Sequence, residues 1–293
     1  MAVTNFLRTL FGGLVLLAAF FAVGESPTDG VADQFRPRLD KARQDRGELA
    51  EHNCRAHGDR VKPLVCAYGP PGSDKRVVLF GDSHALQWAP ALIPLARKRG
   101  WRLLTLIRSS CTIAEVVAED PCVRWRANAL RKIESLQPNH IIISTSVGNR
   151  YRLKNKGLNL TRKASEPRLR QGMIRTIRNM KRIDSLVENR SAITLIRDQI
   201  IAPFVPADCL RKNQGRNDKC AFPNRRKFGP GFDWVAARRA GIEPSIDPVK
   251  VLCGRRWCSP AQGRILKYRD SDHITATFAR TLSSWFEQRL GFR

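Results

Sequence analysis

Acidic residues are scarce in this chain: 26 Asp and Glu stand against 52 Lys and Arg, and the formal net charge is +26. Such a field favours anionic partners, namely nucleic acid, phospholipid headgroups or acidic glycans, without choosing among them. Internal repeats and low-complexity tracts are lacking as well, which excludes a repeat array. Because 42% of the 293 residues are hydrophobic, the sequence predicts one large domain, or one domain with a small appendage, and not a disordered chain.

The N-terminal apolar run is short for a membrane span. Residues 10–24 carry no charge, Arg8 precedes them, and Glu25 ends the run. This length is typical of a secretory signal peptide, and the small residues 22–24 form an acceptable cleavage site. If Arg8 is tolerated, residues 6–24 approach the ~20 residues of a membrane anchor. Either alternative places the remainder outside the cytoplasm, and a buried N-terminal core helix is the less favoured interpretation.

Histidines are few. Only Cys253 and Cys258 approach the spacing of zinc ligands, and none of the five histidines lies near that pair in the sequence, which disfavours zinc. The eight cysteines form close sequential pairs, and an even number at short spacing indicates disulfides in an exported chain. Each link would close a short loop and contribute roughly 2–3 kcal/mol. The expected pairs are Cys54 with Cys66, Cys111 with Cys122, Cys209 with Cys220, and Cys253 with Cys258.

A strand, a sharp turn and a helix follow one another around Ser83. Val77–Phe80 is apolar and predicts a short buried strand, Gly81-Asp82-Ser83 is small and polar, and residues 85–99 have helical spacing. Gly100 is expected to end that helix as its C-cap. A serine in this turn lies at the positive end of a helix, where backbone N–H groups can bind a developing oxyanion.

Apolar strands and helical stretches alternate along the rest of the chain. This alternation predicts an α/β fold with a mostly parallel sheet, covered by helices on both faces. Before it, residues 25–50 are charged, contain Pro27 and Pro37, and predict a linker with one helix over 34–50. The remaining expected strands are 101–107, 140–145, 192–197 and 249–252, and the remaining expected helices are 122–136, 166–186, 234–240 and 274–290.

Asp270 and His273 stand just before the last expected helix. A serine hydroxyl needs a base, because it is essentially un-ionised at neutral pH. His273 is the best candidate base for Ser83, and Asp270 is placed to hold its other ring nitrogen, in a chain order that a Ser-His-Asp triad permits. The alternative is that these acids only cap the last helix. Both interpretations hold if Asp272 caps the helix while Asp270 orients the histidine.

These motifs resemble a known family. Gly81-Asp82-Ser83-His84 after the first strand, with Asp270 and His273 before the last helix, resembles the SGNH hydrolase superfamily. The nearer likeness is to the SGNH domain fused to acyltransferase-3 membrane proteins, which are bacterial O-acetyltransferases of cell-surface polysaccharides. This branch is favoured by His84, by Ser110-Cys111 after the second strand, and by the loop between Cys253 and Cys258.

The resemblance covers roughly residues 50–290. It implies a three-layer flavodoxin-like SGNH fold, preceded by an N-terminal hydrophobic helix. It divides the chain into residues 1–24 as signal peptide or membrane anchor, 25–50 as linker and 51–293 as the catalytic domain.

The resemblance also implies a catalytic triad of Ser83, Asp270 and His273, with no cofactor and no metal. The N–H of Ser83 is one oxyanion donor. Superfamily members commonly add a glycine N–H after the second strand and an asparagine side chain after the third. Here the second-strand loop has no glycine, and the N–H of Ser110 is the candidate donor in its place. Asn149 is the candidate asparagine, although the acyltransferase-linked branch often lacks one. His84 projects differently from its neighbour in the turn, so we expect it to pack or to shape the substrate site.

The function implied is acetyl transfer to hydroxyls of an envelope polysaccharide or lipopolysaccharide, through an acyl-enzyme on Ser83. A stand-alone domain would need a separate acyltransferase-3 membrane partner as acetyl donor. The first alternative is an O-acetyl esterase that gives the acyl group to water, and the second is a non-catalytic basic glycan- or membrane-binding module. A cytoplasmic nucleic-acid binder would explain the charge but not the expected export or the paired cysteines, so no nucleic-acid partner is expected.

Residues 150–182 are the most basic segment, with twelve Lys or Arg against one acid, Glu166. We expect this segment on the glycan or membrane side, where it would raise the local concentration of an anionic substrate. A solvated helix face is the alternative. The chain as a whole is expected on the periplasmic or extracellular face, attached to the membrane by residues 6–24.

Overall fold

A computed structural model describes residues 27–117, 120–148, 153–155, 158–183, 193–199, 201–224, 231–242 and 246–290. The expected N-terminal hydrophobic helix and anchor, residues 6–24, lie outside these ranges. Among the helices within them, none is long and apolar enough to cross a membrane.

The centre of the fold is a five-stranded sheet with the order β1-β3-β2-β4-β7. Four of its strands are parallel, and the edge strand β1 runs antiparallel to β3. Its apolar central strands are buried on both faces, as strands of a parallel sheet between helices usually are. This sheet confirms the expected α/β fold. The strands are β1 (Cys66–Tyr68), β2 (Arg76–Gly81), β3 (Arg102–Ile107), β4 (His140–Ser144) and β7 (Ile193–Leu195).

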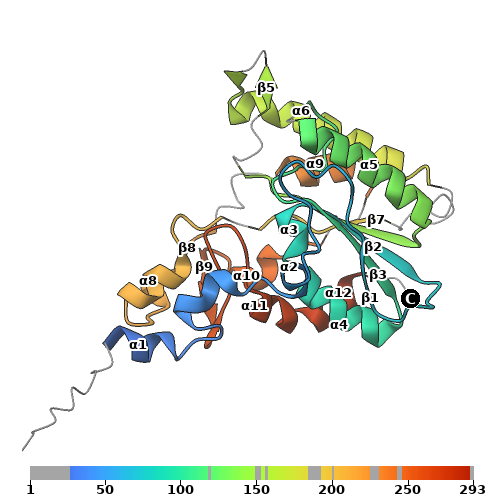
Figure 1. Cartoon of the computed structure of the whole chain (residues 1–293). Coiled ribbons are helices and arrows are strands. Elements are labelled where there is room, and N and C mark those ends of the chain that lie inside the picture. Colours follow the sequence, from blue (N-terminus) through green and yellow to red (C-terminus); the bar gives the residue numbers. More distant parts are fainter. Residues whose placement is uncertain are drawn as a thin grey trace, which may run out of the picture.

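Helices cover both faces of the sheet, so the molecule has three layers (Figure 1). One face is covered by α4 (Ala89–Arg99), α11 (Ala276–Thr281) and α12 (Ser283–Leu290), and the other by α5 (Asp120–Leu136), α6 (Arg162–Met180) and α9 (Phe232–Arg239). Gly100 ends α4 in the left-handed conformation, with φ at 68°. A small hairpin of β5 (Lys154–Asn155) and β6 (Leu158–Asn159) precedes α6.

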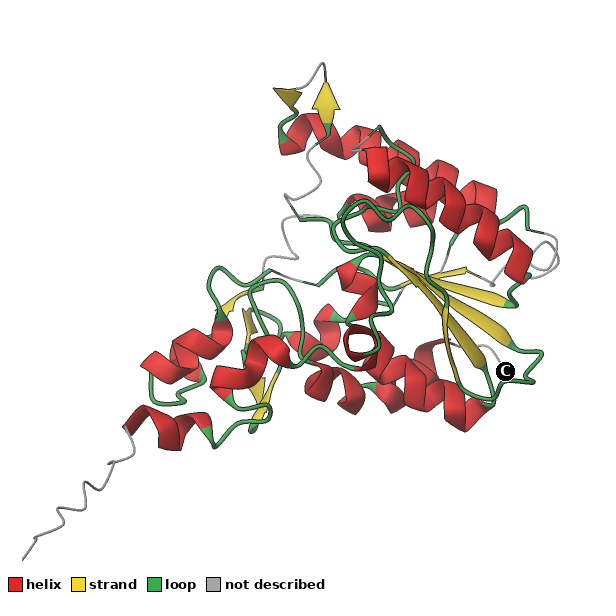
Figure 2. Cartoon of the chain, viewed as in Figure 1, coloured by secondary structure: helices red, strands yellow, loops and turns green. Residues whose placement is uncertain are grey.

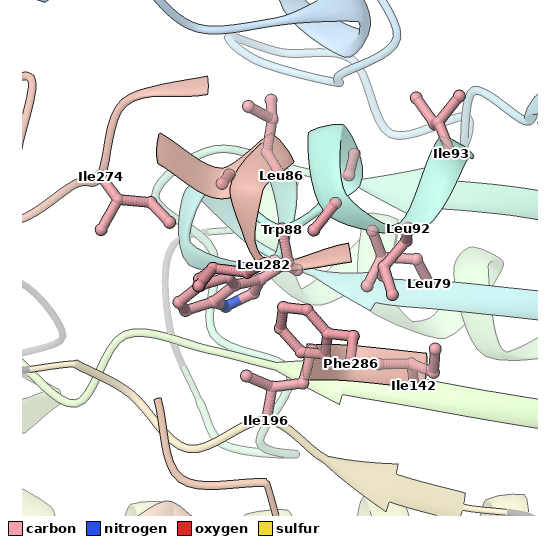
Figure 3. Packing of buried hydrophobic residues seen from close by; sticks show 14 of the residues in the cluster. Leu79, Leu86, Trp88, Leu92, Ile93, Ile142, Ile196, Ile274, Leu282 and Phe286 are labelled. Atoms are coloured by element: carbon pink, nitrogen blue, oxygen red, sulfur yellow. The ribbon is translucent and has the colours of Figure 1, made fainter. Parts of the chain in front are cut away.

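Alternate side chains of each strand enter two hydrophobic cores, one on each face of the sheet. In β2, Val77 and Leu79 belong to the core beside α4, whereas Val78 and Phe80 belong to the core beside α5. Figure 3 shows the first core, in which the rings of Trp88 and Phe286 meet edge to face at 5.6 Å. Burial of each such side chain contributes roughly 1.5–3 kcal/mol. Packing in both cores therefore fixes the position of β2, after which the candidate site begins.

The single helix expected over residues 85–99 is two helices. The first, α3 (Ser83–Leu86), ends before Trp88, and α4 begins at Ala89. Pro90 lies in the first turn of α4 and has no N–H to donate to the carbonyl of Leu86, so the helical ladder cannot run through. The last expected helix likewise divides into α11 and α12.

The strand expected over residues 249–252 is wrong, because these residues form the helix α10 (Val249–Leu252). The side chain of Asp247 accepts the N–H of Val249 at 3.1 Å, which satisfies a donor that a starting helix leaves open. Pro248 directly precedes the helix, and proline is common at helix starts. Asp247 and Pro248 therefore favour a helix over the apolar stretch that follows them.

Residues 27–50 pack against the rest of the chain more closely than the expected linker. In place of one helix over 34–50 they form α1 (Pro27–Ala32), the 3-10 helix η1 (Leu39–Gln44) and α2 (Glu48–Glu51). Phe35 and Leu39 join a separate hydrophobic cluster, and Leu49 is fully buried in the core beside α4.

Asp45 connects this N-terminal segment to the start of α11. Its carbonyl accepts the N–H of Ala276 at 3.1 Å, and its Oδ2 accepts the N–H of Thr277 at 2.9 Å. One helical turn further, Arg280 pairs with Glu48 at 3.0 Å. The segment upstream of the first strand therefore satisfies donors of a helix that begins shortly after His273.

A smaller lobe of short elements lies beside the three layers (Figure 2). It contains α8 (Pro206–Lys212), the 3-10 helix η2 (Asp218–Cys220), and the short strands β8 (Phe222–Pro223), β9 (Trp257–Cys258), β10 (Ala261–Gln262) and β11 (Ile265–Leu266). All four predicted disulfides are present, and the chain has no free cysteine. Together they indicate an exported protein.

Candidate active site

Ser83 begins α3 directly after β2, at the carboxyl edge of the sheet, and it is partly exposed. The turn before it requires glycine. A Cβ on Gly81 would lie 2.0 Å from the carbonyl oxygen of Ser144 and 2.5 Å from the Cβ of Ala85. Any side chain at position 81 would therefore push β2 away from β4 and displace the serine.

Asp82 fixes the conformation of this turn. Its Oδ1 caps α3 by accepting the N–H of His84 at 2.8 Å. Its Oδ2 accepts the hydroxyl of Thr145 at 2.8 Å and the N–H of Ser146 at 2.9 Å. The carboxylate therefore joins the serine turn to the loop that follows β4, which is the neighbouring strand.

The structure brings the three predicted triad residues together from opposite ends of the chain. The Nε2 of His273 lies 2.9 Å from the Oγ of Ser83. The Nδ1 of the same ring lies 3.0 Å from both carboxylate oxygens of Asp270. With its hydrogen on Nδ1, the neutral ring donates to Asp270, and Nε2 can accept the serine proton.

Asp270 is held as a carboxylate. Burial by itself raises the pKa of Asp270, but the hydrogen bond and charge of His273 and the guanidinium of Arg269 outweigh it and hold that pKa well below its ordinary value. Arg269 lies 3.2 Å from the carboxylate. Asp270 also accepts the backbone N–H of Asp272 at 3.0 Å and of His273 at 2.7 Å, which ties it to its own loop.

The helix-cap interpretation of Asp272 is wrong. The next helix, α11, begins at Ala276, and its N-cap is Thr275, whose side chain accepts the N–H of Phe278. Asp272 instead faces two imidazole rings. Its Oδ1 lies 3.4 Å from the Nδ1 of His273, and its Oδ2 lies 3.9 Å from the Nε2 of His84.

His84 is the residue whose surroundings the sequence predicted least well. It is almost fully buried, and its Nδ1 lies 2.5 Å from the Oδ1 of Asp198. Burial alone lowers the pKa of His84, but the charge and hydrogen bond of Asp198, with the charges of Asp82 and Asp272, outweigh it and raise the pKa to about 9. At neutral pH the ring is therefore a buried imidazolium.

A pair of glutamines joins the same loops. The Nε2 of Gln87 donates to the Oε1 of Gln199 at 2.7 Å, and the Oε1 of Gln87 accepts the N–H of Ile274 at 2.9 Å. The Nε2 of Gln199 donates to the carbonyl of Asp272. Together these bonds connect α3, the end of β7 and the loop that carries His273.

One sequence signal could have found Asp198 and Gln199. Both directly follow the strand predicted over residues 192–197 and lie a few residues after β7, and the carboxyl ends of parallel strands meet at one edge of a sheet, where Ser83 also lies. Polar residues immediately after a predicted strand are therefore candidates for the site. Their partner His84 could not be identified in this way, because the pairing depends on how the loops fold.

The other two expected oxyanion donors remain predictions. Ser110 lies in the loop after β3, is exposed, and has a positive φ of 57°. The disulfide between Cys111 and Cys122 fastens this loop to α5. Asn149 lies outside the described residues.

Ligand atoms of His84, Asp272 and His273 lie within 4.8 Å of one another, a grouping that resembles a metal site. A histidine must be neutral to bind a metal ion. The Asp198 carboxylate favours the protonated form of His84. A buried ion-pair network accounts for the grouping without a metal.

Within the described part of the basic segment, exposed cations lie along α6. Two adjoining cavities of about 480 and 430 Å³ lie beside this helix, around Val116, Val117 and Arg175, and include no triad residue. The exposed cations of α6 are Arg162, Lys163, Arg168, Arg175 and Arg178.

Comparison with protein families matches residues 53–288 to the model described as SGNH domain (fused to AT3 domains). Among solved structures, the chain is similar to the periplasmic domain of a lipopolysaccharide acetyltransferase from Salmonella ser. Paratyphi A. The identity is 15%, the TM-score is 0.60, and the match covers 90% of this chain and 99% of that one. At this identity the likeness shows the fold alone.

Two esterases are more distant. A carbohydrate acetylesterase from Sinorhizobium meliloti is 12% identical with a TM-score of 0.44, covering 74% of this chain and all of that one (100%). An acetylxylan esterase from Geobacillus stearothermophilus is 16% identical with a TM-score of 0.38, covering 76% of this chain and 96% of that one. A search of curated proteins found no significant match.

Proposed function

Because the chain belongs to the family of SGNH domains fused to AT3 domains, we propose that it transfers acetyl groups to hydroxyls of an envelope glycan through an acyl-enzyme on Ser83. The observation that carries this proposal is the hydrogen-bonded chain from Ser83 Oγ through His273 to Asp270, with distances of 2.9 and 3.0 Å. This chain supplies a nucleophile, a base and an orienting carboxylate at an accessible edge of the sheet.

In the first half-reaction, Ser83 Oγ attacks the acetyl carbonyl of the donor while His273 Nε2 takes the serine proton. The tetrahedral oxyanion collapses, His273 returns the proton to the leaving group, and acetyl-Ser83 remains. In the second half-reaction His273 deprotonates a sugar hydroxyl, which attacks the acetyl carbonyl of acetyl-Ser83. The bond between the acetyl carbon and Ser83 Oγ then breaks, His273 returns the proton to Oγ, and the acetylated sugar leaves. The carboxylate of Asp270 stabilises the imidazolium formed in both steps.

The donor and the location follow from the same proposal. An acyltransferase-3 membrane protein would deliver the acetyl group, and an envelope polysaccharide or lipopolysaccharide would accept it. The family description, which joins such domains to AT3 domains, supports a membrane partner. The four disulfides support the periplasmic or extracellular face. Residues 1–24 would serve as signal peptide or anchor, and residues 51–293 as the catalytic domain.

An O-acetyl esterase is the second candidate, because the same triad hydrolyses the acyl-enzyme when water replaces the sugar hydroxyl. The two functions differ in which acceptor reaches acetyl-Ser83 first. A non-catalytic glycan-binding module is less well supported, because binding alone gives no reason for a hydrogen-bonded Ser83–His273–Asp270 chain.

The test is an acetate mass balance on the purified full-length chain, with an acetyl ester donor and with or without candidate glycans. Acetyl groups that appear on the glycan at the expense of free acetate support transfer, whereas unchanged acetate release supports an esterase. Ser83→Ala and His273→Ala should both abolish donor consumption with the fold intact. If Ser83→Ala retains full turnover, the enzyme interpretation fails and the binding module becomes the better account.

A further inference from the structure

A second buried histidine lies beside the proposed base. The Nδ1 of His84 lies 2.5 Å from the Oδ1 of Asp198. Asp198 is itself fixed, because its Oδ2 accepts the N–H of Val147 at 2.8 Å and its Oδ1 accepts the N–H of Gln199 at 3.0 Å. The ring therefore has one orientation, set by the loops after β4 and β7.

The opposite edge of the His84 ring faces the proposed catalytic loop. Its Nε2 lies 3.9 Å from Oδ2 of Asp272, and the other oxygen of that carboxylate lies 3.4 Å from Nδ1 of His273. The centroids of the two imidazole rings are 4.8 Å apart. Asp272 therefore stands between one histidine that moves a proton in the proposed reaction and one that does not.

Three carboxylates lie around His84: Asp82 at the start of α3, Asp198 after β7 and Asp272 before α11. Among the described residues that face the ring, His273 is the other titratable group. Unpaired charges are costly in a protein interior. A protonated His84 supplies the positive charge that these buried carboxylates require.

Another buried histidine shows that burial alone does not produce this state. His140 bonds the hydroxyl of Thr194 at 2.8 Å, and its pKa is lowered by burial to about 3. The pKa of His84 is raised to about 9, although burial works against it, because Asp198 and its neighbours are carboxylates. The difference between the two sites is the charge of their partners.

We infer that His84 is a positioning residue for proton transfer, whose protonated ring links Asp198 to Asp272 and so holds His273 ready to accept the Ser83 proton. This inference rests on the proposed function, since it assigns a task within that site. No proton passes through His84 in either half-reaction. Its positive charge is the property that acts.

The charge acts in two ways. It attracts Asp272, which otherwise competes with Asp270 for the Nδ1–H of His273, and so leaves that hydrogen to the carboxylate at 3.0 Å. It also contributes to the electrostatic field at the neighbouring ring, whose centroid lies 4.8 Å away. At about 5 Å in a protein site, a unit charge shifts an ionisation by on the order of one to two pH units.

The first test is the pH profile of kcat/KM for a small neutral acetyl ester. In His84→Gln the acid limb, where the base becomes protonated, should move up by about one pH unit or more. Adding Asp272→Asn removes the carboxylate that His84 balanced, so the double variant should return the limb toward the wild-type pH. His140→Gln, a substitution of the other buried histidine, should leave the limb in place.

A purely structural role predicts a different pattern. His84→Gln would then lower kcat without moving the acid limb, and the double variant would be further damaged instead of restored. Either result overturns the inference.

The second test needs no variant of His84. Ring ¹⁵N NMR of the Ser83→Ala protein, with His84 identified by its contact to the His273 ring, should show a protonated ring up to at least pH 8. A ring that loses its proton below pH 7.5 overturns the inference. Because this protein lacks the proposed nucleophile, the charge state of His84 is measured separately from the proposed function, which is tested by donor consumption and by the acetate mass balance.

Discussion

Two carboxylates approach the same nitrogen of His273, and replacing each in turn tests which one orients the ring. Asp270 places both oxygens 3.0 Å from Nδ1, whereas the nearer oxygen of Asp272 is 3.4 Å away. In Asp270→Asn the amide nitrogen can donate to Nδ1, which favours the tautomer with hydrogen on Nε2. That hydrogen would point at Ser83 and leave the serine without a base.

The expected loss for Asp270→Asn is on the order of 10³–10⁴-fold in kcat, as for other triads whose acid is replaced by its amide. At 1.36 kcal/mol per decade this is about 4–5.5 kcal/mol of transition-state stabilisation. The remaining amide oxygen can still accept the backbone N–H groups of Asp272 and His273, now at 3.0 and 2.7 Å. The loop should therefore keep its fold, unlike in Asp270→Ala.

Asp272→Asn is the matched control, because it makes the same chemical change two residues further along the same loop. Its loss in kcat at the optimum pH should stay below about tenfold, since Asp270 keeps the hydrogen bond. The assay is steady-state turnover of a small acetyl ester, with thermal unfolding of each variant to establish that it is folded. Equal losses, or a greater loss for Asp272→Asn, would show that Asp270 does not orient the base.

Two further expectations concern pH and charge. The pKa of His84 rises from 6.5 to about 9 on folding, so His84 contributes about 3 kcal/mol to the free energy of unfolding; this contribution is fully present below pH 6.5 and is lost as pH rises. The pKa of His140 falls to about 3, so its effect is the opposite, and the free energy of unfolding falls as pH drops below 6.5. The denaturant concentration at the unfolding midpoint should therefore be highest near pH 6.5 and lower by pH 8. Above pH 8 buried Lys267, whose pKa burial lowers to about 8, acts in the opposite sense. Equal stability at pH 6.5 and 8 would refute the raised pKa of His84. Reversing charges on α6 (Lys163, Arg168 and Arg178 to Glu) should lower kcat/KM on an anionic polymer, most at low salt, and leave a small neutral ester unaffected; an equal loss on both would show that the segment is structural.

The residues brought together at the site were largely predictable because each lies at a position that local rules define. Ser83 follows an apolar strand and a glycine turn, and Asp270 and His273 precede a helix. This order permits a Ser-His-Asp triad, and the family resemblance favoured the triad over a simple helix cap. The layers were predictable for a similar reason. Buried parallel strands have apolar centres, as residues 141–143 do, and such runs stand out from the amphipathic helices between them.

Interactions across the fold were not predictable in the same way. Asp198 reaches His84 only because β7 pairs with β4 and β4 with β2, and no local pattern encodes that distance. The short apolar stretch 249–252 is compatible with a strand or a helix. The hydrogen bond that the N–H of Val249 donates to the Asp247 side chain favours the helix. Residues 27–50 are charged on average, yet a few apolar positions among them find partners far along the chain.

The hydrogen bonds that Ala276 and Thr277 donate to Asp45 bear on where this molecule can be divided. The family match begins at residue 53, and a boundary drawn there would discard both acceptors. The first turn of α11 would then begin with two more unsatisfied donors, immediately after the loop that presents His273. The family match and the folded unit therefore have different N-terminal boundaries in this chain. The segment by which the family is identified is shorter than the segment that supports the loop carrying His273.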